Sequence, residues 1–128
     1  MISEMAIDFL VAAVKAEKEA AIDVRGLFHS DHEAWAVLKE EVEELCECLD
    51  EQEAMHHRLD LLWDMIRINN EIDEGDLNLL YNFAKSCAEE AVQVMAMCLK
   101  WGESNEQCEQ EEGRSGGDED QRHFKQRD

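Results

Sequence analysis

The chain contains no proline, and glycine is scarce until its C-terminal region. Alanine, leucine, glutamate and methionine are abundant, so helix-favouring residues dominate and the residues that build strands and tight turns are missing. With 128 residues and 45% hydrophobic content, the chain can bury one core, and nothing suggests a second domain. We therefore predict an all-α fold in which four helices form a bundle-like arrangement.

Capping residues predict where the first two helices begin. Ser3 can cap a helix over about residues 4–24, and Gly26 suits the C-terminal end of that helix. The segment 30–33 then has the Ser-x-x-Glu form of a capping box. A second helix is therefore predicted to start near Asp31.

Two further helices and a tail complete the predicted chain. Apolar residues at helical spacing predict a third helix over residues 52–73. A fourth helix follows a turn at 73–76 and ends near Trp101-Gly102. Beyond this point the composition changes to Glu, Gln, Gly, Asp, Ser and Arg, which supply almost no core residue. We therefore divide the chain into an all-α domain over 1–102 and a disordered, acidic, low-complexity tail over 103–128.

The net charge and the apolar stretches limit the classes of partner, and the cysteine content bears on the cellular compartment. A formal net charge of -20 argues against nucleic acid and anionic membranes as partners, because both are negatively charged. The longest apolar stretch, around 7–14, is far short of the roughly 20 residues that a membrane span needs. The five cysteines are an odd number, in a chain whose N-terminus shows no signal pattern. We therefore expect a cytoplasmic protein with reduced thiols.

Two clusters of carboxylates lie on different predicted helices: Glu40, Glu41 and Glu44 on the second, and Glu89 and Glu90, with the amide of Gln93, on the fourth. Glutamates three residues apart in a helix project to one side of it. Acidic residues at the edge of an apolar face are costly unless a positive charge compensates them, and Mg²⁺ prefers several converging oxygen ligands. The spacing therefore predicts a Mg²⁺ site between the two helices.

These residues resemble a known family, the MazG-like all-α nucleoside triphosphate pyrophosphohydrolases. That family carries a Glu-Glu-x-x-Glu motif, followed on a later helix by Glu-x-x-Asp. The first motif corresponds to residues 40–44 of this chain and the second to Glu90-Ala91-Val92-Gln93. The segments 28–37 and 89–97 are also similar to a phage- and prophage-associated branch of the family.

The resemblance implies an activity and a set of residue roles. The implied reaction is the Mg²⁺-dependent hydrolysis of a nucleoside triphosphate between its α and β phosphates, which releases pyrophosphate and a nucleoside monophosphate; Mn²⁺ is a possible substitute. Glu41, Glu44 and Glu90 would be metal ligands, and Gln93 would occupy the last ligand position. Glu40 would be the catalytic residue that orients water, or an additional ligand. Since thin helical units often complete their core by association, we also expect a homodimer or a higher homo-oligomer.

Two departures from the family pattern leave alternatives open. Gln93 replaces the aspartate of the motif, and an amide oxygen can coordinate Mg²⁺ but brings no negative charge. The segment between Glu44 and Glu90 is longer than usual in the family. One alternative is a non-catalytic helical binding protein that retains the fold with a degenerate metal site. Another is a purely structural bundle, in which the glutamates form a solvated face.

Other residues with metal-binding or ionic chemistry have simpler interpretations. Lys85 and Glu89 are four residues apart and form a surface ion pair, so Glu89 is given no catalytic role. Glu53-x-x-His56 is one half of the paired motif that a di-iron bundle needs. Cys46-x-Cys48 lacks the second pair of ligands that a zinc site needs, which favours small core residues.

Overall fold

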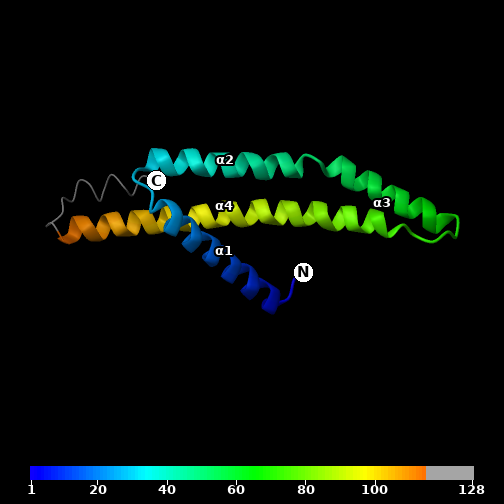
Figure 1. Cartoon of the computed structure of the whole chain (residues 1–128), viewed down its shortest axis with the longest axis horizontal. Helices are drawn as coiled ribbons and strands as arrows, with labels where there is room; N and C mark the ends of the chain where they lie inside the picture. Colours follow the sequence, from blue (N-terminus) through cyan, green and yellow to red (C-terminus); the bar gives the residue numbers. More distant parts are fainter. Residues whose placement is uncertain (115–128) are drawn as a thin grey trace. The chain divides into compact units, whose positions relative to one another are not determined.

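The computed structural model describes residues 1–114, and within this range it contains four α-helices and no strand (Figure 1). The helices are α1 (Glu4–Arg25), α2 (Asp31–Leu49), α3 (Gln52–Arg67) and α4 (Glu74–Arg114). The all-α prediction is thus confirmed. None of the helices in the described range is long and apolar enough to cross a membrane. The chain divides into two compact units, one formed by residues 39–94 and the other by residues 1–38 with the chain from Met95 onward.

Local hydrogen bonds set the helix starts, as the sequence predicts. The Ser3 hydroxyl accepts a hydrogen bond from the backbone N–H three residues later, at 3.2 Å. The Ser30 hydroxyl does the same at the start of α2, at 3.1 Å. At the start of α4, the Asp73 carboxylate accepts the N–H two residues later, at 2.8 Å. Each bond satisfies an N–H that the first turn of a helix leaves without a partner.

The C-terminal end of α3 differs from the prediction. The helix ends at Arg67, whereas the apolar spacing predicted a helix as far as residue 73. Asn69 adopts a left-handed backbone conformation with φ of 56°. The backbone N–H of Asn70 then bonds to the carbonyl of Met65 at 3.0 Å, a pattern that closes a helix. The polar pair Asn69-Asn70 therefore terminates α3, although the apolar Ile72 follows it.

The end of α4 also differs from the prediction. The helix continues to Arg114, so the predicted end near Trp101-Gly102 is wrong and the domain boundary at residue 102 falls inside α4. Ser104 is buried, and its hydroxyl accepts the backbone N–H of Phe28 at 2.9 Å. Glu103 pairs with Lys18 of α1 at 3.0 Å. The first residues of the predicted tail thus contact distant parts of the chain as part of α4, and the remainder of the predicted tail, 115–128, lies outside the described residues.

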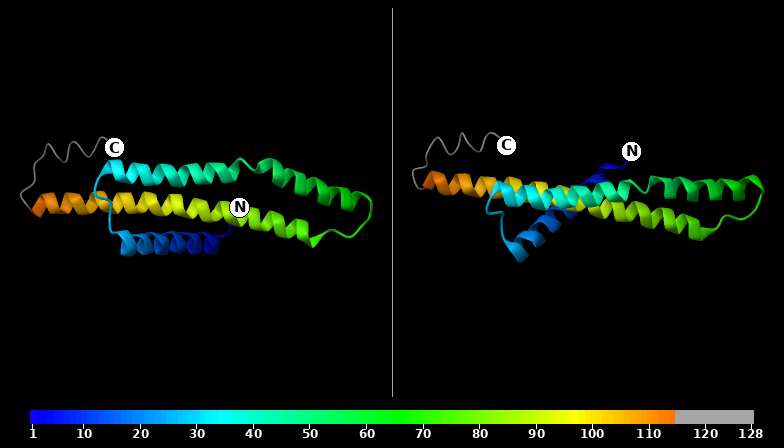
Figure 2. Two further views of the ribbon diagram at one scale, coloured as in Figure 1. Left: turned by 45° about the horizontal axis from the view of Figure 1, so that its top comes forward. Right: turned by 90° about the horizontal axis from the view of Figure 1, so that it is seen from above.

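The unit formed by residues 39–94 contains the end of α2, all of α3 and the beginning of α4. In Figures 1 and 2, α3 lies beside the first part of α4 and runs in the opposite direction. Arg58 of α3 pairs with Asp76 of α4 at 3.2 Å, and the Asp76 side chain is only 11% exposed. Among the described apolar residues of this unit, only Leu62 is buried. Its apolar core is therefore thin.

The other unit has a small core built from α1, the beginning of α2 and the later part of α4. Its buried apolar residues are Val14, Ala34, Ala96 and Met97. The two alanines are completely buried, which is possible because their small side chains let helix backbones approach closely. Across both units, many large apolar side chains are exposed, including Phe9, Val24, Trp35, Trp63 and Tyr81. Much apolar surface therefore remains open to solvent.

Candidate metal centre

Three of the predicted ligands come together between α2 and α4. Glu41 and Glu44 come from α2 and Glu90 comes from α4, and each offers a carboxylate oxygen that lies within 4.8 Å of the other two. Glu41 and Glu90 are half-buried, and Glu44 is exposed. The three-residue spacing on α2 places both of its carboxylates on one side of the helix, as the sequence predicts.

The proximity of the carboxylates disfavours their charged forms. Burial, followed by the negative charges of Glu44, Glu90 and Glu40, raises the pKa of Glu41 above its ordinary value. Burial and a hydrogen bond with Glu44 likewise raise the pKa of Glu90, with further contributions from the charges of Glu44 and Glu89. The cluster therefore holds more negative charge than its surroundings stabilise.

Among the described residues, this cluster has no basic partner. In the part of the chain that the structure describes, no ion pair with a lysine, arginine or histidine reaches Glu41, Glu44 or Glu90. The nearby pairs instead involve their neighbours: Lys39 with Glu43 at 3.5 Å, and Lys85 with Glu89 at 3.3 Å. The second of these confirms the predicted surface pair.

The donor set fits a hard divalent cation. Carboxylate oxygens are the ligands that Mg²⁺ prefers, and opposite oxygens around Mg²⁺ are about 4.2 Å apart. The oxygens of Glu41, Glu44 and Glu90 lie within 4.8 Å of one another, close to that span. A cation would also supply the missing positive charge. Within the described residues, Glu53, His56 and Cys46 belong to no converging group of three or more His, Cys, Asp or Glu side chains.

The other two residues of the predicted site lie on the same helices. Glu40 is exposed on α2, outside the group of three, and its charge contributes to the raised pKa of Glu41. Gln93 is half-buried on α4, three residues after Glu90. The predicted roles of Glu40 and Gln93 stay predictions.

A disulfide joins the same two helices, which the sequence analysis missed. Cys48 of α2 and Cys87 of α4 are bonded, with their Cα atoms 5.7 Å apart. The expectation that all the thiols are reduced is therefore wrong for this pair, whereas Cys46, Cys98 and Cys108 lie outside the bond and are exposed. The spacing of the cysteines from the glutamates could have predicted this bond. Cys48 follows Glu44 by four residues and Cys87 precedes Glu90 by three, so each cysteine shares a helix face with a glutamate of the cluster.

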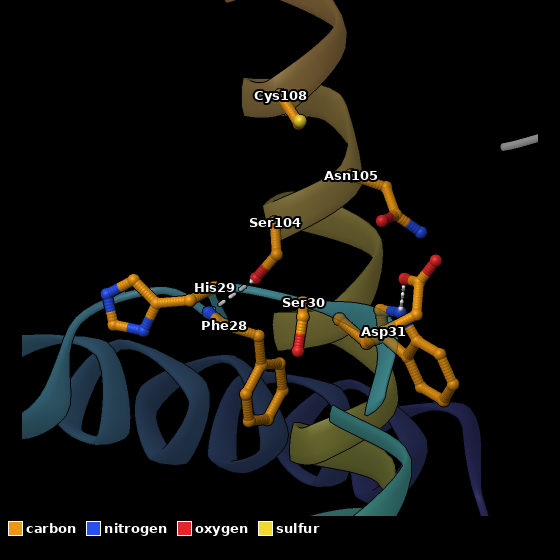
Figure 3. Close-up of a pocket in the computed structure, with 8 residues that line it drawn as sticks. Phe28, His29, Ser30, Asp31, Ser104, Asn105 and Cys108 are labelled. Carbon is orange, nitrogen blue, oxygen red and sulfur yellow. Dashed lines mark hydrogen bonds between the residues drawn. The ribbon is translucent and has the colours of Figure 1, made fainter. Parts of the chain in front are cut away.

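A separate cavity of about 190 Å³ lies in the unit that contains α1, where the chain enters α2 beside the later part of α4 (Figure 3). The indole N–H of Trp101 donates to the Asp31 carboxylate at 2.8 Å. The Lys100 ammonium lies 4.2 Å from the centre of the Phe28 ring, and burial lowers the pKa of Lys100. In Figure 3 the His29 imidazole points away from these residues. These interactions hold the start of α2 against the later part of α4.

Fold and site together define an all-helical protein in which two antiparallel helices carry a cluster of three carboxylates beside a disulfide. The chain matches no protein-family model, no curated protein and no solved structure.

Proposed function

We propose that this protein is a Mg²⁺-dependent nucleoside triphosphate pyrophosphohydrolase of the MazG-like class, in which Mn²⁺ can replace Mg²⁺. One observation carries the proposal. The three glutamates that the MazG-like motifs mark as ligands, Glu41, Glu44 and Glu90, have oxygens within 4.8 Å of one another although they come from two helices. The raised pKa of Glu41 and of Glu90 supports it, because a site built for a cation leaves uncompensated negative charge when metal-free.

The proposal gives each residue of the cluster a task. Glu41, Glu44 and Glu90 hold the cation through their carboxylates, and the amide oxygen of Gln93 assists them. Glu40, exposed beside this group, accepts a proton from the water that attacks the phosphate chain. A cation held by these residues would neutralise phosphate charge and would lower the pKa of a coordinated water. The products are pyrophosphate and a nucleoside monophosphate.

The acidic character of the chain agrees with a substrate that arrives with its own cation. At a net charge of -20, a free triphosphate is repelled, and a Mg²⁺-bound triphosphate is repelled less. The same charge disfavours nucleic acid as a partner. We place the protein in the cytoplasm, where such nucleotides occur, and propose that it forms a homodimer or a higher homo-oligomer. The exposed apolar side chains of the helices support this association.

A second candidate function rests on Gln93. An amide in place of the motif's aspartate brings one negative charge fewer to the cation, which weakens binding. A non-catalytic helical binding protein would keep the fold and a degenerate metal site without turnover. If the protein has this second function, it binds the metal as well or more weakly, and it releases no pyrophosphate.

The test is pyrophosphate release from a panel of canonical and modified nucleoside triphosphates with Mg²⁺ or Mn²⁺. Glu41→Gln removes one ligand charge with little change in shape, and we expect it to lower the rate at least 100-fold, within the range typical of losing a group that stabilises developing charge. Glu43→Gln is the matched control, because it removes the same charge from an exposed position of the same helix. We expect this control to keep the native rate.

The possible results separate the two candidates. Release that requires both metal and Glu41 supports the enzyme and identifies its substrate. The absence of release from every nucleotide, in a folded protein that binds Mn²⁺ through Glu41, supports the binding protein. Equal rates for Glu41→Gln and Glu43→Gln would contradict the proposed site.

A further inference from the structure

The disulfide lies one helical turn from the carboxylate cluster. Cys48 and Glu44 are four residues apart on α2, and Cys87 and Glu90 are three apart on α4. Residues at these spacings lie on the same face of a helix, about one turn apart. The covalent bond therefore joins α2 and α4 directly beside two of the three carboxylates.

The carboxylates need such a connection because they repel one another. The carboxylate oxygens of Glu41, Glu44 and Glu90 lie within 4.8 Å of one another, and no basic side chain among the described residues pairs with them. Apolar packing in the described part of this unit is thin, because Leu62 of α3 is buried and the other apolar side chains are half-buried or exposed. The disulfide is thus a main restraint on the spacing of α2 and α4 at the cluster.

We propose that the Cys48–Cys87 disulfide is a redox switch that sets the divalent-cation affinity of the Glu41, Glu44 and Glu90 cluster. This inference rests on the metal site of the proposed function. With the disulfide intact, the three carboxylates are held within the span that a cation bridges. With the bond reduced, repulsion separates the two helix segments, and the cation must bring them back together before it binds.

The switching reaction is thiol–disulfide exchange with a dithiol reductant. The reductant transfers two electrons and two protons, the Cys48–Cys87 bond breaks to give two thiols, and the reductant becomes a disulfide. Both cysteines are half-buried, so their sulfurs are within reach of a small dithiol. A reversible bond of this kind is the type of disulfide expected in a reducing compartment.

Linkage adds a second consequence. If the disulfide strengthens cation binding, the bound cation must stabilise the disulfide by the same factor. Mn²⁺ is therefore expected to shift the thiol–disulfide equilibrium of Cys48 and Cys87 toward the oxidised form. This effect can be measured on the unmodified protein.

The experiment compares Mn²⁺ binding by the oxidised and the dithiol-reduced full chain, with free Mn²⁺ followed by electron paramagnetic resonance. We expect the dissociation constant to rise roughly 10- to 100-fold on reduction, the range typical of losing a group that orients metal ligands. The double variant Cys48→Ser/Cys87→Ser should bind weakly under both conditions. The triple variant Cys46→Ser/Cys98→Ser/Cys108→Ser keeps the disulfide and should show the full response.

Each other result overturns a specific part of the inference. If the oxidised protein binds no Mn²⁺, or binds it equally after Glu41→Gln, the metal site of the proposed function fails. If binding requires Glu41 but is equal in both redox states, the site stands and the switch fails. The switch also fails if five thiols titrate after oxidation, or if Mn²⁺ leaves the equilibrium of Cys48 and Cys87 unchanged. Circular dichroism completes the test, since global unfolding on reduction would make the bond a general restraint instead of a switch.

Discussion

At the scale of the residue, Glu41 is a carboxylate whose surroundings oppose its charge. Burial and the neighbouring carboxylates raise its pKa in the folded protein above the ordinary value of 4.5. A raised carboxyl pKa contributes stability that is fully present below the unfolded-state value and is lost as pH rises through the folded-state value. In metal-free protein, we therefore expect Glu41→Gln to unfold at a higher temperature than the native chain at neutral pH. This difference should shrink as the pH falls toward 4.5.

Thermal unfolding followed by circular dichroism, with a chelator present, checks this expectation across that pH range. Glu43→Gln corrects for the general effect of removing one negative charge from α2, because Glu43 is exposed and lies outside the cluster. If the two variants are stabilised equally at every pH, the local effect assigned to Glu41 is absent.

At the scale of the element, the helix starts and the end of α1 at Gly26 were predictable, whereas the ends of α3 and α4 were not. Ser3, Ser30 and Asp73 bond to backbone N–H groups two or three residues away, so a short window of sequence contains both partners. The continuation of α4 past Gly102 brings contacts with residues far away in the chain, such as the bond between Ser104 and Phe28, and no local pattern contains these partners.

In the candidate site, too, short-range relationships were easier to predict than contacts between distant residues. The convergence of Glu41 and Glu44 is a property of helical spacing and was predictable. Their meeting with Glu90 was expected because acidic residues of both helices lie at the edge of an apolar face, and the resemblance pointed to the same three residues. The bond between Cys48 and Cys87 joins residues 39 apart in sequence, and composition alone favoured reduced thiols. The disulfide could have been predicted from the position of each cysteine on the same helix face as a glutamate of the cluster.

The extension of α4 beyond Gly102 gives a prediction about an element. Ser104→Ala removes the acceptor of the Phe28 N–H and leaves that part-buried donor without its partner. We expect a loss of about 1–3 kcal/mol in the free energy of unfolding, the cost of a buried polar group that loses its hydrogen bond. Urea unfolding measures this loss. Ser86→Ala, at an exposed position of the same helix, should be neutral or slightly stabilising, and an equal loss in both variants would contradict the anchoring role of Ser104.

At the scale of the whole molecule, a large net charge and a thin core act together. The chain carries 32 acidic and 12 basic residues, so repulsion opposes the compact state. Large apolar side chains such as Phe9 and Trp63 remain exposed, which favours association between copies of the chain. Because association makes the unfolding temperature depend on protein concentration, stability comparisons between variants require a fixed concentration.

Because the whole chain is acidic, a cation can stabilise it either by binding at the cluster or by screening charge over the whole surface. Monovalent salt weakens repulsion everywhere, since the Debye length falls to about 10 Å at 0.1 M, so we expect NaCl to stabilise the native chain and Glu41→Gln alike. Mg²⁺ at the same ionic strength should stabilise the native chain further, by about 2.7 kcal/mol when its concentration is 100 times the dissociation constant. Thermal unfolding with matched NaCl and MgCl₂ measures both effects. If Glu41→Gln gains as much from Mg²⁺ as the native chain, the cation acts on the acidic surface as a whole and Glu41, Glu44 and Glu90 hold no specific ion.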